Sequence, residues 1–188
     1  MNYSVLTALL IYCLSFSASA QSDSTASVSP FVSVHAGTLM GKPGKGTSVS
    51  LTLAPGLRLN RLAIVVGTGY DTYVAWRTLP VFAGVGYDFF KRPDYVFFVQ
   101  FHTGYSKAWN IRTGDFSPEY KNEGGYFYHP FIGCRLSHGK AKIYFTAGYK
   151  FQNLTYEEVP RPTWGGGQVK KSVVADMQRF SVQIGIGI

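Results

Sequence analysis

The final stretch of the chain, Phe180 to Ile188, alternates between apolar side chains and small or polar ones. Val182, Ile184 and Ile186 share one face of this pattern, and Ser, Gln and Gly residues occupy the other. A strand with a period of two has one apolar face and one polar face. The segment therefore predicts a β-strand that lies between an apolar and a polar environment.

The same alternation recurs along the chain and predicts eight strands. They are expected over Pro30–Met40, Ser48–Leu59, Leu62–Tyr73, Thr78–Phe90, Tyr95–Trp109, Gly125–Leu136, Ala141–Thr155 and Val174–Ile188. Tight turns rich in Asn, Pro, Asp, Ser and Gly alternate with longer connections, of which Asn110–Gly124 and Tyr156–Val173 are the longest. Short turns at one end and longer loops at the other are typical of an up-and-down membrane barrel. The predicted fold is therefore all-β: an eight-stranded antiparallel up-and-down transmembrane β-barrel.

Side-chain bulk decides which face of the strands points outward. In the fifth predicted strand Phe97, Val99 and Phe101 share one face, and Gln100 and His102 share the other. An eight-stranded barrel has an interior only just wide enough for side chains. We therefore expect the bulky face to contact lipid and the polar face to line the bore. Many Tyr, Phe and Trp residues fall near strand ends, as in the aromatic girdles of membrane proteins.

The first twenty residues predict an export signal rather than part of the fold. An apolar run precedes the sequence Ala18-Ser19-Ala20, which suits cleavage before Gln21. We assign residues 1–20 to the signal peptide and 21–188 to one outer-membrane barrel domain. Cys134 is the single cysteine of that domain, so no internal disulfide is expected. No later stretch has the 18 consecutive apolar residues of a helical span, although 16% of the chain is aromatic. Such a chain enters a membrane as a closed sheet, which leaves no backbone group unpaired in lipid.

The net charge of +8 limits the classes of partner that the chain is expected to bind. A basic surface attracts nucleic acid, anionic lipid or acidic sugar. Nucleic acid is not expected, because the Lys and Arg residues are scattered over loops and turns. Several basic residues near the predicted outer rim are suited to lipopolysaccharide phosphates: Lys42, Lys45, Arg77, Lys107 and Arg112.

Charged residues also fall on the predicted inner face of the strands. Arg58, Asp88 and Arg135 are expected near the tight turns, and Asp71 and Lys150 farther along the bore. Charges inside a narrow barrel must pair or meet water. Together with His102 they predict a polar network that fills the lumen. A gated conduction path through the same residues is the alternative.

The sequence predicts no catalytic, cofactor or metal site. His102 and Ser106 share a strand face, but four strand residues span about 13 Å, too far for a nucleophile and its base. His35, His102 and His129 are all expected on the inner face, where they are interpreted as lumen histidines rather than metal ligands.

The predicted loop Tyr156–Val173 combines charged, aromatic and flexible residues. Such a mixture is suited to surface contact. The residues expected to take part are Arg161, Trp164, Lys170 and Lys171.

The chain resembles the small bacterial outer-membrane barrels of the OmpA/OmpX kind, and more broadly porin-like barrels. Gly-Tyr pairs such as Gly69-Tyr70, Gly86-Tyr87 and Gly104-Tyr105 are typical of these proteins. The resemblance implies location in the cell outer membrane among lipid and lipopolysaccharide, and assembly by the barrel-assembly machinery. One departure is Ile188, where such barrels usually end in an aromatic residue.

We therefore expect a monomeric, non-enzymatic outer-membrane barrel with a side-chain-filled lumen, acting structurally or through an unknown partner of its external loops. A small lipid-modifying outer-membrane enzyme is the first alternative. A soluble, lipocalin-like ligand-binding barrel is the second.

Overall fold

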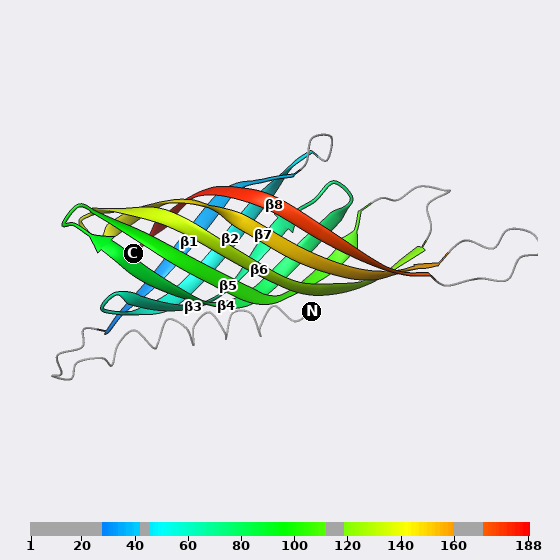
Figure 1. The fold of residues 1–188 in the computed structure, drawn as a ribbon, viewed down its shortest axis with the longest axis horizontal. Helices are drawn as coiled ribbons and strands as arrows, with labels where there is room; N and C mark the ends of the chain where they lie inside the picture. Colours follow the sequence, from blue (N-terminus) through cyan, green and yellow to red (C-terminus); the bar gives the residue numbers. More distant parts are fainter. Residues whose placement is uncertain (1–27, 42–45, 112–118, 160–170) are drawn as a thin grey trace, which may run out of the picture.

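The computed structural model describes residues 28–41, 46–111, 119–159 and 171–188, and these form a closed antiparallel barrel of eight strands in sequence order (Figure 1). The strands are β1 (Val28–Met40), β2 (Thr47–Leu59), β3 (Leu62–Thr72), β4 (Trp76–Lys91), β5 (Tyr95–Asn110), β6 (Glu119–His138), β7 (Ala141–Val159) and β8 (Lys171–Gly187). The predicted eight-stranded up-and-down barrel is confirmed. The predicted signal peptide lies outside the described residues.

No helix in the part of the chain that the structure describes is long and apolar enough to cross a membrane.

The barrel closes where the first strand meets the last. β1 pairs with β8 from Ser33 opposite Gly187 to Met40 opposite Phe180, and Val32 exchanges two backbone hydrogen bonds with Ile188. This pairing satisfies the backbone groups that an open sheet leaves at its edges.

Two ends of the barrel are distinguished by their connections. At the turn end, short turns join β2 to β3, β4 to β5 and β6 to β7, and Asn60 and Gly139 take positive φ angles of 56° and 61° there. Asn and Gly are the residues that adopt this left-handed conformation most easily. The opposite end, with the remaining connections, is called the loop end below.

The outer wall of the barrel is apolar along every strand. Outward side chains such as Val49, Val81 and Ile186 are 58, 60 and 68% exposed, whereas their strand neighbours of opposite parity face the lumen. A soluble monomer rarely exposes so continuous an apolar surface. The outer wall is therefore suited to lipid contact.

Glycines on the inner face make room for lumen side chains. A Cβ atom added at Gly84 would lie 2.4 Å from Cδ2 of His102 and 2.7 Å from the backbone oxygen of Phe101. No side chain fits at this position beside the imidazole ring.

At the loop end, three strands continue beyond the rest of the barrel. Pairing of β5 with β6 ends at Ser106 opposite Gly125, and pairing of β1 with β8 ends at Met40, yet β7 remains paired with both its neighbours beyond these points. Figure 1 shows β6, β7 and β8 running on together.

This extension corrects two predicted loops. Residues 119–124, 156–159 and 171–173 belong to strands rather than to the loops 110–124 and 156–173. The apolar alternation does not mark these segments, because they include several charged residues. Backbone pairing, which does not depend on side-chain polarity, nevertheless continues through them.

Candidate functional site: the filled lumen

At the turn end, one carboxylate lies between two guanidinium groups. Arg135 donates a hydrogen bond from Nη2 to Oδ2 of Asp88 over 2.8 Å, and Arg58 Nε lies 3.7 Å from the same oxygen. The three side chains come from β2, β4 and β6, so this ion group joins strands that are not neighbours in the sheet. Arg58 also stacks over Phe31, with 4.6 Å between Cζ and the ring centroid.

A layer of aromatic and imidazole rings fills the middle of the lumen. The ring of His102 stacks on Phe82 at a centroid distance of 4.4 Å and meets Phe131 edge-on at 4.9 Å. The ring centroid of His129 lies 6.2 Å from that of His102 and 4.9 Å from that of Phe131. His35, nearer the turn end, contacts Tyr144 edge-on.

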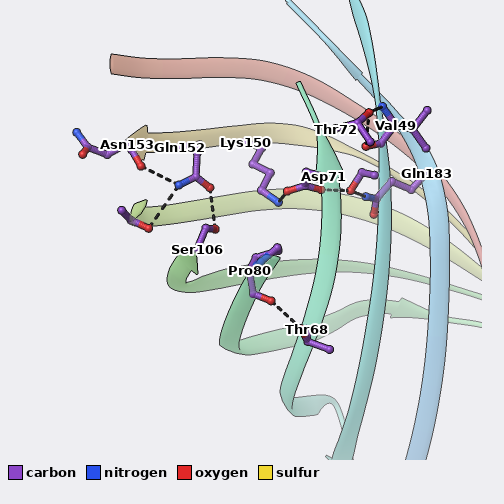
Figure 2. A network of polar contacts seen from close by, with 12 residues as sticks. Val49, Thr68, Asp71, Thr72, Pro80, Ser106, Lys150, Gln152, Asn153 and Gln183 are labelled. Carbon is purple, nitrogen blue, oxygen red and sulfur yellow. Dashed lines mark hydrogen bonds and ion pairs between the residues drawn. The ribbon is translucent and has the colours of Figure 1, made fainter. Parts of the chain in front are cut away.

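A second ion pair lies closer to the loop end. Lys150 of β7 donates to Oδ2 of the fully buried Asp71 of β3, and Ser50 donates to the other carboxylate oxygen over 2.6 Å. Gln183 continues the chain by donating to Ser50 over 3.1 Å. Figure 2 shows Asp71 lying between Lys150 and Gln183. The Lys150 ammonium also lies 4.7 Å from the ring centroid of Phe127.

An apolar cluster closes the loop end of the lumen. Leu39, Tyr73, Trp76, Ala108 and Leu154 are buried together there. Tyr156 from the three-strand extension packs on Trp76 with ring centroids 4.8 Å apart. We call these residues the mouth cluster.

The hydroxyl of Tyr73 stays neutral within this cluster. Burial raises the pKa of Tyr73 well above its usual value, and the nearby charge of Asp71 raises it further. Arg179 lies over the Tyr73 ring at 5.8 Å. The mouth cluster is therefore an uncharged layer beneath the extension.

The structure places the predicted lumen residues in three groups rather than one network. Arg58, Asp88 and Arg135 meet at the turn end, and Asp71 and Lys150 form a separate pair closer to the loop end. His102 belongs to the ring layer between these two ion groups. His102 hydrogen-bonds to Gln100, with 2.8 Å between the two Nε2 atoms.

Sequence reasoning missed the mouth cluster. Trp76 falls between the predicted strands Leu62–Tyr73 and Thr78–Phe90, and Tyr156 begins the predicted loop Tyr156–Val173, so the sequence pattern assigns neither residue to the lumen. The sequence did contain a signal for this cluster, because the aromatic residues Trp76 and Tyr156 lie beside the ends of two predicted strands.

The predicted loop residues Arg161, Trp164 and Lys170 lie outside the described residues, and Lys171 begins β8. Among the predicted rim residues, Lys42, Lys45 and Arg112 also lie outside them. Lys107 is exposed on β5, and Arg77 donates to the backbone oxygens of Tyr73 and Trp76.

His102 and Ser106 have separate partners. Ser106 donates its hydroxyl hydrogen to Oε1 of Gln152 over 2.9 Å, as Figure 2 shows, and His102 contacts Gln100. A nucleophilic serine needs its hydroxyl directed to a base, and here it is directed to an amide. Within the described ranges, no group of three or more His, Cys, Asp or Glu residues is arranged to hold a metal ion.

The closed wall, its apolar outer face and its packed interior define a transmembrane β-barrel of the bacterial outer-membrane class. The sequence matches no protein-family model and no curated protein.

Several solved structures are similar to this chain. Neisserial surface protein A (NspA) is similar with a TM-score of 0.60 and 13% identity, over 86% of this chain and 98% of that one. The outer-membrane protein AlkL has a TM-score of 0.49 and 12% identity, over 90% of this chain and 94% of that one. The N-terminal barrel domain of Pseudomonas aeruginosa OprF has a TM-score of 0.48 and 10% identity, over 84% and 95%. At these identities the similarity to NspA establishes the fold alone.

Proposed function

We propose that the chain is a non-enzymatic outer-membrane barrel with a sealed lumen, which acts as a structural or surface-interaction protein through its external loops. The observation that carries this proposal is that layers of packed side chains fill the lumen from one end to the other. In the proposed orientation in the outer membrane, the turn end faces the periplasm and the loop end faces the outside of the cell.

The lumen layers support a sealed rather than a conducting barrel. The Asp88 ion group, the imidazole layer, the Asp71–Lys150 pair and the mouth cluster follow one another along the bore. The cavity enclosed at the turn end has a volume of about 10 Å³, room for one water molecule. A continuous path for hydrated ions would require rearrangement of several of these layers.

The same packing favours this proposal over its two alternatives. A lipocalin-like barrel needs an internal cavity large enough for a ligand, whereas here the lumen is packed and the apolar wall faces outward. A lipid-modifying enzyme needs a nucleophile and a base in contact, and neither His102 nor Ser106 has the other as its partner.

Partners follow from the position of the charged residues. Lys107 and Arg77, near the loop end of β5 and β4, are suited to lipopolysaccharide phosphates. Membrane insertion by the barrel-assembly machinery is part of the same proposal.

Replacement of residues 160–170 by a short Gly-Ser turn tests the surface role. The change leaves the paired part of the hairpin from Glu158 opposite Lys171 intact, so the barrel is expected to assemble at wild-type levels. Cells that carry the variant are expected to lose the surface adhesion or ligand binding that the wild-type protein confers on cells otherwise lacking it. A fully assembled variant with unchanged binding would contradict a role for this loop.

A further inference from the structure

A groove crosses the apolar outer wall of the barrel. It has a volume of about 710 Å³, and its lining extends from Leu62, beside the β2–β3 turn, to Phe180 of β8. Between these ends the groove crosses β4, β5, β6 and β7. Ligand sites in proteins have volumes of this order. The groove is therefore large enough for a ligand, although it lies on the outside of the barrel rather than in the lumen.

The floor of the groove carries no bulky outward side chain. Pro130 and Ala147 are its outward residues, and Gly148 contributes backbone alone. A Cβ atom at Gly148 would lie 2.4 Å from Cβ of Phe131 and 2.4 Å from the backbone oxygen of Pro130, so no side chain fits there. Pairing of β6 with β7 also lapses at Pro130, which has no N–H to donate. The depression therefore follows from the residues that build this part of the wall.

Large apolar side chains border this floor. Exposed aromatic rings from four strands line the groove: Tyr87, Phe101, Tyr149 and Phe180. None of the described residues that line it carries a charge. A long depression bordered by rings and aliphatic side chains is suited to hydrocarbon, because it offers dispersion contacts on both sides of a chain.

The course of the groove matches one leaflet of a bilayer. Val85, Phe101 and Pro130 are register partners, so the groove runs across the strands rather than along them. Five inter-strand spacings of about 4.8 Å separate β3 from β8, which gives a length of about 24 Å. Since the strands of such barrels tilt by about 40°, this row rises about 15 Å along the membrane normal, half of a hydrocarbon core of about 30 Å. Leu62 lies at the turn end and Phe180 opposite Met40, where pairing of β1 with β8 ends.

The turn end, where the groove begins, is basic on its surface. Four exposed cations lie in or beside the tight turns: Arg61, Lys91, Arg92 and Lys140. Within these described turns Asp94 is the one exposed acidic residue. Basic residues near a membrane surface attract anionic lipid headgroups. Arg61 directly precedes Leu62, so its charge lies at the opening of the groove.

We propose that the groove binds one anionic diacyl phospholipid of the periplasmic leaflet. One acyl chain lies along the groove over Pro130 and Ala147, and the phosphate lies beside Arg61. A neutral lipid would fill the groove but leave the cations of the turns without a counter-charge. A second barrel is convex and follows a curved groove less closely than a flexible chain does. The inference rests on the proposed orientation in the membrane and does not depend on the sealed lumen or on the loops.

Competitive lipid binding to the full-length barrel in a neutral detergent tests the site. Phosphatidylglycerol and phosphatidylcholine with identical acyl chains are supplied in equal amounts, and native mass spectrometry counts the lipids that the folded barrel retains. One phosphatidylglycerol is expected to be retained about tenfold more often than phosphatidylcholine, because a charge-assisted contact with Arg61 contributes about that factor. Equal retention of the two lipids would overturn the proposal.

Matched variants locate the lipid. Ala147→Phe fills the floor of the groove and is expected to abolish retention of the lipid, whereas Ala83→Phe adds the same ring to the outer wall at a residue that does not line the groove. Arg61→Gln is expected to lower the retention of phosphatidylglycerol to that of phosphatidylcholine. Its control is Lys140→Gln, which removes one charge from the β6–β7 turn. An equal response of either variant and its control would overturn the assignment.

Photo-crosslinking of the wild-type barrel provides a measurement that does not depend on any variant folding. The protein is reconstituted in phosphatidylglycerol vesicles in which a small fraction of the lipid carries a diazirine at the end of one acyl chain. Crosslinks are expected to concentrate on Tyr149 and Phe180, at the end of the groove away from Arg61. Crosslinks spread evenly around the outer wall would overturn the proposal.

Discussion

Asp71 is fully buried, and its carboxylate depends on Lys150 and Ser50 for compensation. Lys150 in turn lies against Phe127 rather than water. Taking a single charge out of such a pair leaves the other buried without compensation, whereas removing both charges avoids that cost. The stability of this layer therefore depends on the two residues jointly.

A double-mutant cycle on this pair gives the first prediction at the residue scale. Lys150→Met alone is expected to lower the free energy of unfolding by about 3–5 kcal/mol, because Asp71 keeps its charge in a dry site. Adding Asp71→Asn is expected to restore a large part of that loss. Urea-induced unfolding from lipid vesicles measures each variant, and purely additive effects of the two changes would contradict a coupled pair.

At the scale of single strands, parity along the backbone decides which side chains share the lumen. In β4 the pattern holds from Trp76 to Asp88, and then the register with β5 shifts so that Phe89 and Phe90 both face outward. This bulge ends the inner face of β4 at Asp88. It leaves the carboxylate as the last inward side chain before the turn.

The inner face of β4 also provides a sharp test of packing. Gly84→Val is expected to lower the free energy of unfolding by about 1–3 kcal/mol or to prevent folding, because its side chain would collide with His102 and Val65. Ala83→Val adds the same kind of bulk one residue away, on the exposed outer face, and should leave stability nearly unchanged. Equal effects of the two changes, measured by denaturant unfolding in detergent, would show that the lumen is not tightly packed at Gly84.

At the scale of the whole molecule, much of the fold was predictable from the sequence because alternation marks both faces of every strand, except at the loop end of β6, β7 and β8. The partners of lumen residues were not predictable. Asp71 and Lys150 are 79 positions apart and come from strands that do not pair, so their contact depends on the stagger of the closed barrel. The mouth cluster was not predicted, for a related reason. It forms at the loop end, where β6, β7 and β8 extend beyond the other strands, and the alternation of side chains does not mark that extension.

The outer wall of the whole barrel predicts a cost for charge that depends on depth. Ile184→Arg is expected to destabilise the folded barrel by about 2–4 kcal/mol, if Ile184 lies near the bilayer midplane, because the charge is placed in hydrocarbon. Leu62→Arg, next to the β2–β3 turn, should cost about 0–1 kcal/mol. Both residues are more than half exposed, at 53 and 55%. Unfolding from vesicles measures both, and equal costs at the two positions would contradict the lipid-facing assignment.

The central claim of a sealed lumen is tested most directly by electrical recording from the purified barrel in planar lipid bilayers. Because the ion groups, the imidazole layer and the mouth cluster fill successive levels of the bore, the wild-type protein is expected to insert without steady conductance steps. Steady steps that recur with each insertion, from a pore wide enough to pass sugars, would contradict the account.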